Sequence, residues 1–488
     1  MWAAVAVGTV LRLAIPYKLV MVFSAYRLAE DAAAFVHVPR SGAAPLVLYR
    51  MAFAAWAPDH LTMVALHTAC GLALLVLLPA LVARGSPPPG TAAVVAWAVG
   101  LTPVFALDGR TENPIVPGLL WLGTGALLWD AGLASARRFW LVGAVVLLAL
   151  AAQSRPELVA VAPAAAVALA WRHRAQPGWR VRVAGAAVAW LALVAPHLLH
   201  LRHAIALEQA AGSVPALGPG YWLQVPVRLA GSALPLLPAL FPVVTTLLAV
   251  AGLFAAKTRN TVAALLAIAA LWMALTTVDL PRTSVPRLHA GAALLVTVAA
   301  ARALCGWWQR MAPARPRVWA FGLAAVWLGS ALPGASALLA RTNEDDAEQF
   351  LREAVAALPA TGACVVALDM GDEPPAHRTQ RAFPAYLLRP PHRDAKLYSV
   401  EGWRRADQPL CPAGTYFVVD HRCFAMHADG RAAGITPSPM VDGCARLLRE
   451  HPWSPVLARS VPNRGDNEYG YYGATRQFRL ALYRLARR

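Results

Sequence analysis

The stretch RFWLVGAVVLLALAAQSRPELVAVAPAAAVALAWR, residues 138–172, decides the fold of this chain. It consists of two apolar runs, 138–153 and 157–171, joined by the short segment Ser154-Arg155-Pro156-Glu157. A helix needs about 20 mostly apolar residues to cross roughly 30 Å of hydrocarbon. We therefore interpret the stretch as a tight hairpin of two short membrane-spanning helices, with its turn at one membrane surface.

The same pattern recurs through the first 340 residues. Hydrophobic residues make up 58% of the chain and charged residues 14%, whereas about 25% of the residues of a soluble domain are charged. The sequence predicts an α-helical polytopic membrane protein with about eleven transmembrane helices. Arg12, Pro16 and Lys18 interrupt the first span, so either that helix is short and tilted or it starts further upstream. The predicted spans lie near residues 2–23, 59–83, 91–107, 114–130, 138–153, 157–171, 180–201, 231–256, 260–278, 285–301 and 318–340.

Basic residues in alternate loops predict the orientation, because cytoplasmic loops carry an excess of Lys and Arg. The basic residues are spread between apolar runs instead of forming one basic face, so the net charge of +18 does not indicate a nucleic-acid partner. The opposite loops, 24–58, 108–113, 154–156, 202–230 and 279–287, are expected outside the cytoplasm. The inner loops hold 13 basic residues: Arg84, Arg137, Arg138, Arg172, Arg174, Arg180, Arg182, Lys257, Arg259, Arg302, Arg310, Arg315 and Arg317.

Acidic residues are rare in the same region and gather on one side. The first 340 residues contain nine, and placing one in hydrocarbon costs roughly 3 kcal/mol. Asp130 is predicted on the inner side. The other eight fall on the outer side beside several arginines, which favours a site that handles protons and phosphates: Glu30, Asp31, Asp59, Asp108, Glu112, Glu157, Glu208 and Asp279.

Four outer segments carry this chemistry: residues 26–31, 108–114, 154–157 and 281–289. Each pairs an arginine with a carboxylate or a histidine at the predicted edge of the bilayer. A carboxylate can deprotonate an acceptor hydroxyl, and arginines can hold a phosphate whose negative charge grows as it leaves. The alternative interpretation is structural, because Pro156 and Glu157 also suit the first turn of a helix.

The composition changes at residue 341. Residues 1–340 are predicted as the transmembrane domain, and 341–488 as a soluble α/β domain outside the cytoplasm. Cys364, Cys411, Cys423 and Cys444 permit two disulfides there, although free buried thiols remain an alternative. The predicted strands are 364–369, 396–400, 416–421 and 478–485, and the predicted helices are 345–357 and 445–450.

Several motifs, taken in order, resemble the GT-C class of polytopic glycosyltransferases. They are Leu11-Arg12-Leu13, the acidic pair Glu30-Asp31, residues 44–49, Leu101-Thr102-Pro103 before Asp108, the Ser154–Glu157 turn and Pro286-Arg287-Leu288-His289. The resemblance covers roughly residues 5–300. Protein mannosyltransferases and the aminoarabinose transferase of lipid A are examples of this class, whose members use polyprenyl-phosphate sugars.

The resemblance implies a multi-pass enzyme of the inner or plasma membrane that acts on the cell envelope. It implies an inverting transfer of sugar from a polyprenyl-phosphate donor to an acceptor on the outer face. Asp31, with Glu30 close behind, corresponds to the catalytic carboxylate. Asp108 and Glu112 correspond to a second acidic site near the acceptor, where the sequence leaves a divalent metal open. Arg110, Arg155 and Arg287 correspond to residues that bind the donor phosphate.

Two other classes of protein fit parts of the pattern. A transporter or flippase of a lipid-linked sugar also needs many spans and outer basic residues. Such a protein should carry charges near the midplane and often shows two related halves, neither of which this sequence displays. A non-catalytic envelope assembly protein is the third class, because the charged tail could bind a partner. The sequence favours the enzyme and leaves the acceptor open among a protein, a lipid and a polysaccharide.

Overall fold

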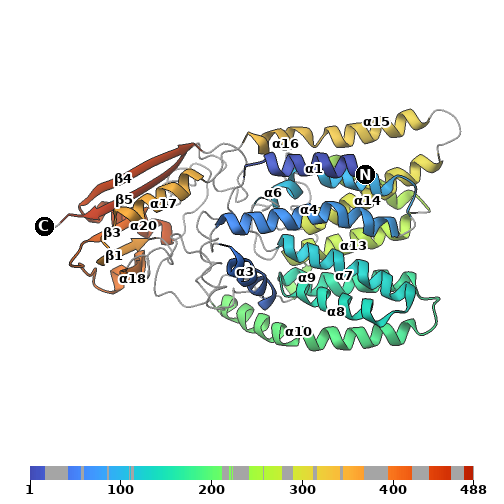
Figure 1. Cartoon of the computed structure of the whole chain (residues 1–488), viewed down its shortest axis with the longest axis horizontal. Coiled ribbons are helices and arrows are strands. Elements are labelled where there is room, and N and C mark those ends of the chain that lie inside the picture. Colours follow the sequence, from blue (N-terminus) through green and yellow to red (C-terminus); the bar gives the residue numbers. More distant parts are fainter. Residues whose placement is uncertain are drawn as a thin grey trace. The chain divides into compact units, whose positions relative to one another are not determined.

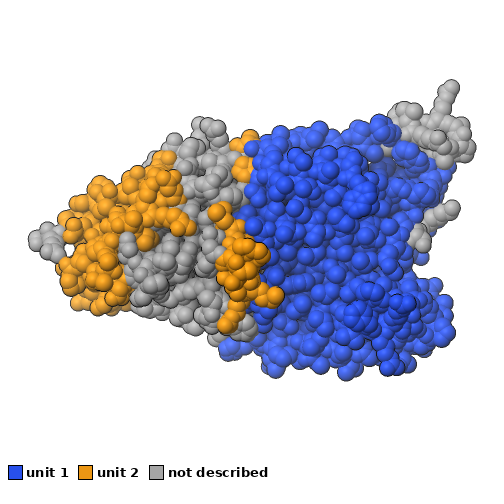
Figure 2. Space-filling model, in the orientation of Figure 1, with its two compact units in different colours: residues 1–15, 39–48, 64–339 blue, residues 16–38, 49–63, 340–488 orange. Residues whose placement is uncertain are grey.

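The structure is a computed structural model, which describes residues 1–16, 42–56, 60–84, 87–108, 110, 115–210, 219–220, 222–223, 241–256, 258–276, 289–310, 316–340, 345–367, 394–419, 439–462 and 477–486. The chain divides into two compact units (Figure 2). Unit 1 comprises residues 1–15, 39–48 and 64–339, and unit 2 comprises residues 16–38, 49–63 and 340–488.

Unit 1 is helical, and its helices run roughly alongside one another (Figure 1). A helix overlaps each of the eleven predicted spans. Five described helices are long and apolar enough to cross a membrane: those over 61–84, 115–135, 179–206, 290–310 and 321–339. The helices that belong wholly or partly to unit 1 are α1 (Trp2–Ala14), α3 (Ala43–Ala55), α4 (His60–Arg84), α5 (Thr91–Leu101), α6 (Pro103–Asp108), α7 (Ile115–Ser135), α8 (Arg138–Ala152), α9 (Pro156–Arg172), α10 (Trp179–Ala210), α12 (Val243–Ala251), α13 (Arg259–Thr276), α14 (Ala290–Arg310), α15 (Pro316–Gly329) and α16 (Leu332–Leu339), with a 3₁₀ turn at Gly252–Phe254.

Prolines set several of the helix ends. The helix α1 stops at Ala14, well short of the predicted residue 23, because Pro16 disfavours a helical conformation for Ile15, whose φ and ψ are −67° and 124°. Thr102 is extended in the same way before Pro103 and separates α5 from α6. The span predicted over 91–107 is therefore two helices. In contrast, Pro156 begins α9, since a proline at the first helical position loses no hydrogen bond.

Small residues allow the helices of unit 1 to pack closely. A Cβ atom on Gly8 of α1 would lie 2.9 Å from the Cα atom of Gly100 in α5, so the two backbones almost touch. Gly291 of α14 faces the indole of Trp272 in α13, and a Cβ atom there would lie 2.4 Å from the ring. Trp272 is completely buried. These contacts fix α1 to α5 and α13 to α14.

Helix α10, in contrast, has many exposed apolar side chains. Val181, Val188 and Leu199 are 77%, 69% and 69% exposed, although the helix is apolar along most of its length. An apolar helix surface of this kind suits a lipid environment. The helix lies along one margin of the helical unit in Figure 1, and α15 lies along the opposite margin.

The C-terminal part of unit 2 contains a five-stranded mixed sheet in the order β2-β1-β3-β5-β4. The strand β1 pairs in parallel with β2 and β3, whereas β5 pairs antiparallel with β3 and β4. All four predicted strands and both predicted helices are present, and β4 was not predicted. The elements are α17 (Asp345–Ala357), β1 (Thr361–Ala367), β2 (Asp394–Ser399), α18 (Val400–Arg405), β3 (Thr415–Val419), α20 (Pro439–Glu450), β4 (Trp453–Pro462) and β5 (Gln477–Leu485).

Helices and a disulfide complete the core of this α/β part. Phe350 of α17, Trp403 of α18 and Leu447 of α20 are fully buried in one apolar cluster with β1, β3 and β5. Cys364 in β1 is bonded to Cys411, with 5.5 Å between their Cα atoms. The predicted bridge among the four tail cysteines is thereby confirmed. Cys444 is also disulfide-bonded, and Cys423 lies outside the described residues.

Candidate functional site

Two of the predicted site residues have described side chains, Arg110 and Arg155. Helix α6 ends at Asp108, whose side chain is not among those described. The remaining predicted residues lie outside the described part of the chain: Glu30, Asp31, Glu112 and Arg287.

Arg155 forms a bidentate ion pair with Glu157 at the turn between α8 and α9. Its Nη2 lies 2.8 Å from Oε1 of Glu157, and its Nε lies 3.2 Å from Oε2. Glu157 is in the first turn of α9, where a negative charge interacts favourably with the helix dipole. Its side chain is 6% exposed and that of Arg155 is 23% exposed. Pro156 and Glu157 thus lie in the first turn of α9, as the structural interpretation predicted, and the ion pair holds the guanidinium of Arg155 in place.

Residues of α7 and a residue next to α14 lie close to this turn. Gly118, in the first turn of α7, packs against Ser154, so a Cβ atom there would lie 2.9 Å from the Cβ atom of Ser154. His289, which directly precedes α14, is fully buried and lies within electrostatic range of Glu157. Residue 289 closes the predicted fourth outer segment. The described residues of three predicted segments, namely 108 and 110, 154–157, and 289, therefore lie at the same end of unit 1.

Arg110 is held by two other elements at that end. Its Nε donates to the carbonyl oxygen of Ile15, 3.0 Å away, and its Nη1 donates to Oγ1 of Thr68 in α4, 3.2 Å away. The Thr68 hydroxyl in turn donates to the carbonyl oxygen of Val64. Burial lowers the pKa of Arg110 from its ordinary value, because desolvation disfavours the charged form.

Ile15 and Gly42, described residues that precede and follow Glu30 and Asp31 in the sequence, both make contacts at this site. Ile15 accepts the hydrogen bond from Arg110. Gly42 donates its backbone N–H to the carbonyl oxygen of Gln153 at 2.6 Å. Gln153 lies two residues before Arg155. The close approach requires glycine, because a Cβ atom on Gly42 would lie 2.8 Å from Gln153 and 2.9 Å from His197.

Arg12 is a buried cation whose role the sequence did not reveal. It is 1% exposed, and its guanidinium donates to the carbonyl oxygens of Gly8, Val99 and Gly100 at 3.0–3.2 Å. Val99 and Gly100 lie in the last turn of α5, where carbonyl oxygens lack helical partners and a positive charge favours the helix dipole. Arg12 therefore joins α1 to the end of α5. The sequence shows an arginine in an apolar run and gives no sign of this partner.

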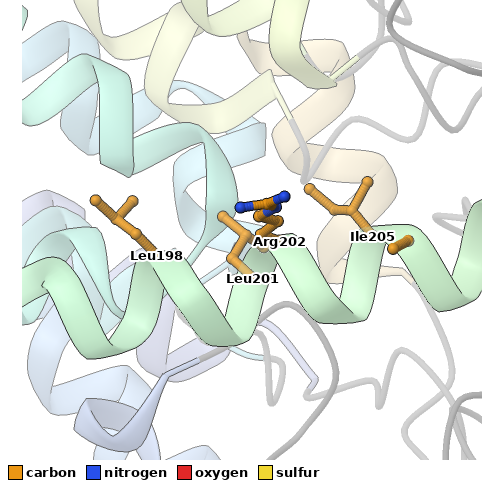
Figure 3. A pocket seen from close by; sticks show the side chains of 5 residues that line it. Leu198, Leu201, Arg202 and Ile205 are labelled. Atoms are coloured by element: carbon orange, nitrogen blue, oxygen red, sulfur yellow. The ribbon is translucent and has the colours of Figure 1, made fainter.

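A hollow of about 450 Å³ lies along α10, lined by Leu198, Leu201, Arg202, Ile205 and Ala206 (Figure 3). The labelled side chains project from the same side of the helix (Figure 3). Arg202 gives this apolar surface one positive charge. His197 and His200 stack one turn away, with ring centroids 6.3 Å apart. The described residues contain no group of three His, Cys, Asp or Glu side chains that could hold a metal ion.

The sequence matches no protein-family model and no curated protein. The fold is nevertheless similar to that of a protein of known structure. The similarity is to the crystal structure of ArnT from Cupriavidus metallidurans bound to undecaprenyl phosphate, with a TM-score of 0.51 and 13% sequence identity. The match covers 99% of this chain and 96% of that chain. The resemblance inferred from the motifs is thus confirmed at the level of the fold.

Proposed function

We propose that this protein is a membrane-embedded, inverting glycosyltransferase. It transfers a sugar from a polyprenyl-phosphate donor to an acceptor on the outer face of the inner or plasma membrane. The observation that carries the proposal is the fold match over 99% of the chain to ArnT, whose structure contains undecaprenyl phosphate. Arg110 and Arg155 at one end of unit 1 support it, because their guanidinium groups can supply positive charge and hydrogen-bond donors to the phosphate of a lipid-linked donor.

Arg110 and Arg155 are suited to hold the donor phosphate. Each uses Nε and one terminal nitrogen for contacts within the protein. Within the described part of the chain, Nη2 of Arg110 and Nη1 of Arg155 make no hydrogen bond. A guanidinium fixed on one edge presents its remaining donors in a set direction, which favours binding of a phosphate oxygen. Arg287 is the third cation of this proposed set.

Asp31 is the proposed general base, with Glu30 beside it. The hydroxyl of the acceptor attacks the anomeric carbon and forms the new carbon–oxygen bond. The bond between that carbon and the phosphate oxygen breaks, and the polyprenyl phosphate leaves with the electron pair. The acceptor proton passes to the carboxylate. Asp108 and Glu112 form the proposed second acidic site, which orients the acceptor directly or through a divalent metal.

The attachment of residues 15 and 42 supports this assignment. One contact involves Arg110, and the other involves Gln153, two residues before Arg155. Ile15 and Gly42 themselves therefore lie beside the proposed phosphate-binding residues. A base must reach the proton of the acceptor while the arginines contact the phosphate of the same reacting pair.

The test is turnover by the purified full-length chain. A panel of radiolabelled polyprenyl-phosphate sugars is incubated with the protein and with membrane extracts containing lipid, polysaccharide and protein acceptors. We expect transfer from one donor, with inversion at the anomeric carbon observed by NMR, and loss of transfer in Asp31→Asn. Movement of an intact lipid-linked sugar across vesicles without transfer would identify a flippase and overturn the proposal.

A further inference from the structure

Asp130, the acidic residue predicted on the inner side, is the centre of a charged cluster in unit 1. Its Oδ2 accepts a hydrogen bond from Nε of Arg84 at 3.3 Å. Its Oδ1 lies 3.4 Å from Nη1 of Arg172 and 2.9 Å from Nε2 of His173. The Asp130 side chain is 5% exposed. The cluster joins the ends of α4 and α9 to α7, at the end opposite the candidate functional site.

The positive charges of the cluster exceed the negative one. Arg302 of α14 lies close enough to Arg172 for the two guanidinium groups to repel each other. Two arginines contact the carboxylate, and Arg302 adds a third positive charge near Arg172, so these groups carry a net charge of +2 when His173 is neutral. An isolated structural ion cluster needs no such excess, because every added like charge costs Coulomb energy. A bound anion would offset this repulsion.

The arginines also have donors available for an anion. Arg84 contacts Asp130 through Nε, and both of its terminal nitrogens make no hydrogen bond with described residues. The side chains of Arg84 and Arg172 are 44% and 40% exposed. Nε of Arg84 and Nη1 of Arg172 contact the buried carboxylate, and Nη2 of Arg172 donates to the carbonyl oxygen of Arg84. This arrangement leaves the two terminal nitrogens of Arg84 accessible.

The surroundings indicate that the anion belongs to a lipid. Arg84 is the last residue of an apolar helix long enough to cross a membrane, and Trp171, next to Arg172, is 59% exposed. Arg174 lies over the Trp171 ring, 5.2 Å from its centroid. Tryptophan and arginine at the end of an apolar helix are typical of the headgroup region of a bilayer. Basic pockets between membrane helices are known to bind anionic headgroups.

We propose that Arg84 and Arg172, held by Asp130, bind the phosphate headgroup of an anionic phospholipid. This site is separate from the proposed donor site and does not depend on the proposed function. The two terminal nitrogens of Arg84 recognise the phosphate oxygens, and Arg172 adds a second positive charge beside them. Asp130 acts as a positioning residue that keeps both guanidinium groups in place.

The experiment uses the full-length protein in detergent and native mass spectrometry. Dioleoyl phosphatidylglycerol is titrated against dioleoyl phosphatidylcholine. We expect preferential binding of phosphatidylglycerol, and a loss of affinity of about 10- to 30-fold in Arg84→Gln/Arg172→Gln. Arg137→Gln is the matched control, because Arg137 is an exposed arginine at the start of α8 that makes no hydrogen bond to a described residue. We expect it to bind normally.

A single variant distinguishes a loss of lipid binding from a loss of folding. Arg84→Gln alone retains the contacts of Arg172 and His173 with Asp130, so it should unfold near the wild-type temperature and still bind phosphatidylglycerol more weakly. Equal binding of both lipids by the wild type would overturn the proposal. So would an equal loss of affinity in Arg137→Gln. Displacement of the lipid by an equimolar amount of inorganic phosphate would show that the occupant is a free anion, which also overturns it.

Discussion

Arg155 and Glu157 form a bidentate ion pair across Pro156, and the carboxylate is the more deeply buried partner. The pair serves the structural role that the sequence suggested, and it is compatible with the proposed contact of Arg155 with phosphate. Glu157 stabilises the start of α9, and its oxygens hold one edge of the Arg155 guanidinium. A charge-assisted bidentate pair fixes geometry as well as charge. Arg155 is thereby oriented by the fold before any ligand binds.

Replacing Arg155 with lysine tests the importance of this geometry. Arg155→Lys keeps the positive charge and loses the planar fork. We expect KM for the polyprenyl-phosphate donor to rise about tenfold, with a smaller change in kcat, because a phosphate contact is lost. Steady-state kinetics with a varied donor concentration would measure this. Arg174→Lys, an exposed arginine at the opposite end of unit 1, should leave KM unchanged.

A double-mutant cycle separates the structural and the phosphate-binding roles of Arg155. Glu157→Gln weakens the ion pair and leaves Arg155 in place. If Arg155 acts on the phosphate, Arg155→Lys should still raise KM in the Glu157→Gln background. No further effect in that background, together with lower protein abundance in both single variants, would restrict Arg155 to stabilising the turn.

Asp31→Asn tests the proposed general base. The variant keeps the size and hydrogen-bonding capacity of the side chain but cannot take up the acceptor proton. We expect turnover to fall about 10²–10⁴-fold, on the order of 3–5 kcal/mol, with unchanged abundance. Glu208→Gln, another acidic position on the predicted outer side, serves as the control. Full transfer by Asp31→Asn would move the assignment to Glu30 or Asp108.

Prolines explain much of the difference between the predicted and the observed fold. A helix overlaps each predicted span, but the apolar pattern did not show where Pro16 and Pro103 end or divide the helices. Strand β4 was missed because Pro455 and Pro462 argue against a central strand. In the structure β4 is at the edge of the sheet, where a missing N–H donor is tolerated.

The candidate site was predictable only in part, because some of its contacts join residues that are far apart in the sequence. The turn at Arg155 is local, so its helix-capping role could be inferred from residues adjacent in sequence. The contacts of Arg110 with Ile15 and Thr68 join residues 95 and 42 positions apart. No period or motif within a single segment encodes such a contact. The role of the buried Arg12 could not be predicted, because its long-range hydrogen-bond acceptors lie at the end of another helix, α5.

The topology of the tail gives a direct test of the predicted orientation. Thirteen basic residues in the alternate loops predict that residues 345–488 lie outside the cytoplasm. Alkaline phosphatase fused after Arg488 should therefore be active. The same reporter fused after Ala175, between α9 and α10, should be inactive. The reverse pattern would place the proposed site on the cytoplasmic side and contradict the assigned outer face.

The bond between Cys364 and Cys411 should stabilise the α/β part. It links residues 47 positions apart, and the chain-entropy model gives roughly 4 kcal/mol for a loop of that length. We expect Cys364→Ser/Cys411→Ser to lower the thermal unfolding midpoint of this part, observed by near-ultraviolet circular dichroism. Reductant should lower the midpoint of the variant further through the disulfide of Cys444. An unchanged midpoint in the variant would show that the bridge adds no stability.

Asp130→Asn should destabilise unit 1. The substitution leaves two arginines without the buried carboxylate that holds them. Because Arg84 and Arg172 are 44% and 40% exposed, water screens part of the loss, and we expect about 1–3 kcal/mol. Reversible unfolding in mixed detergent micelles would measure it. Ser135→Ala, at the exposed end of the same helix, should change the free energy of unfolding by less than about 0.5 kcal/mol.

The hydrogen bonds of Arg12 have a consequence for the order of events during synthesis. Its acceptors Val99 and Gly100 lie 87 and 88 residues further along the chain. At about 5–20 residues per second, they are made roughly 4–18 s after Arg12. During that interval the first helix carries a cation whose long-range acceptors do not yet exist. Stable insertion of α1 should therefore wait for α5, and a nascent chain released before residue 99 should hold its first helix only loosely in the membrane.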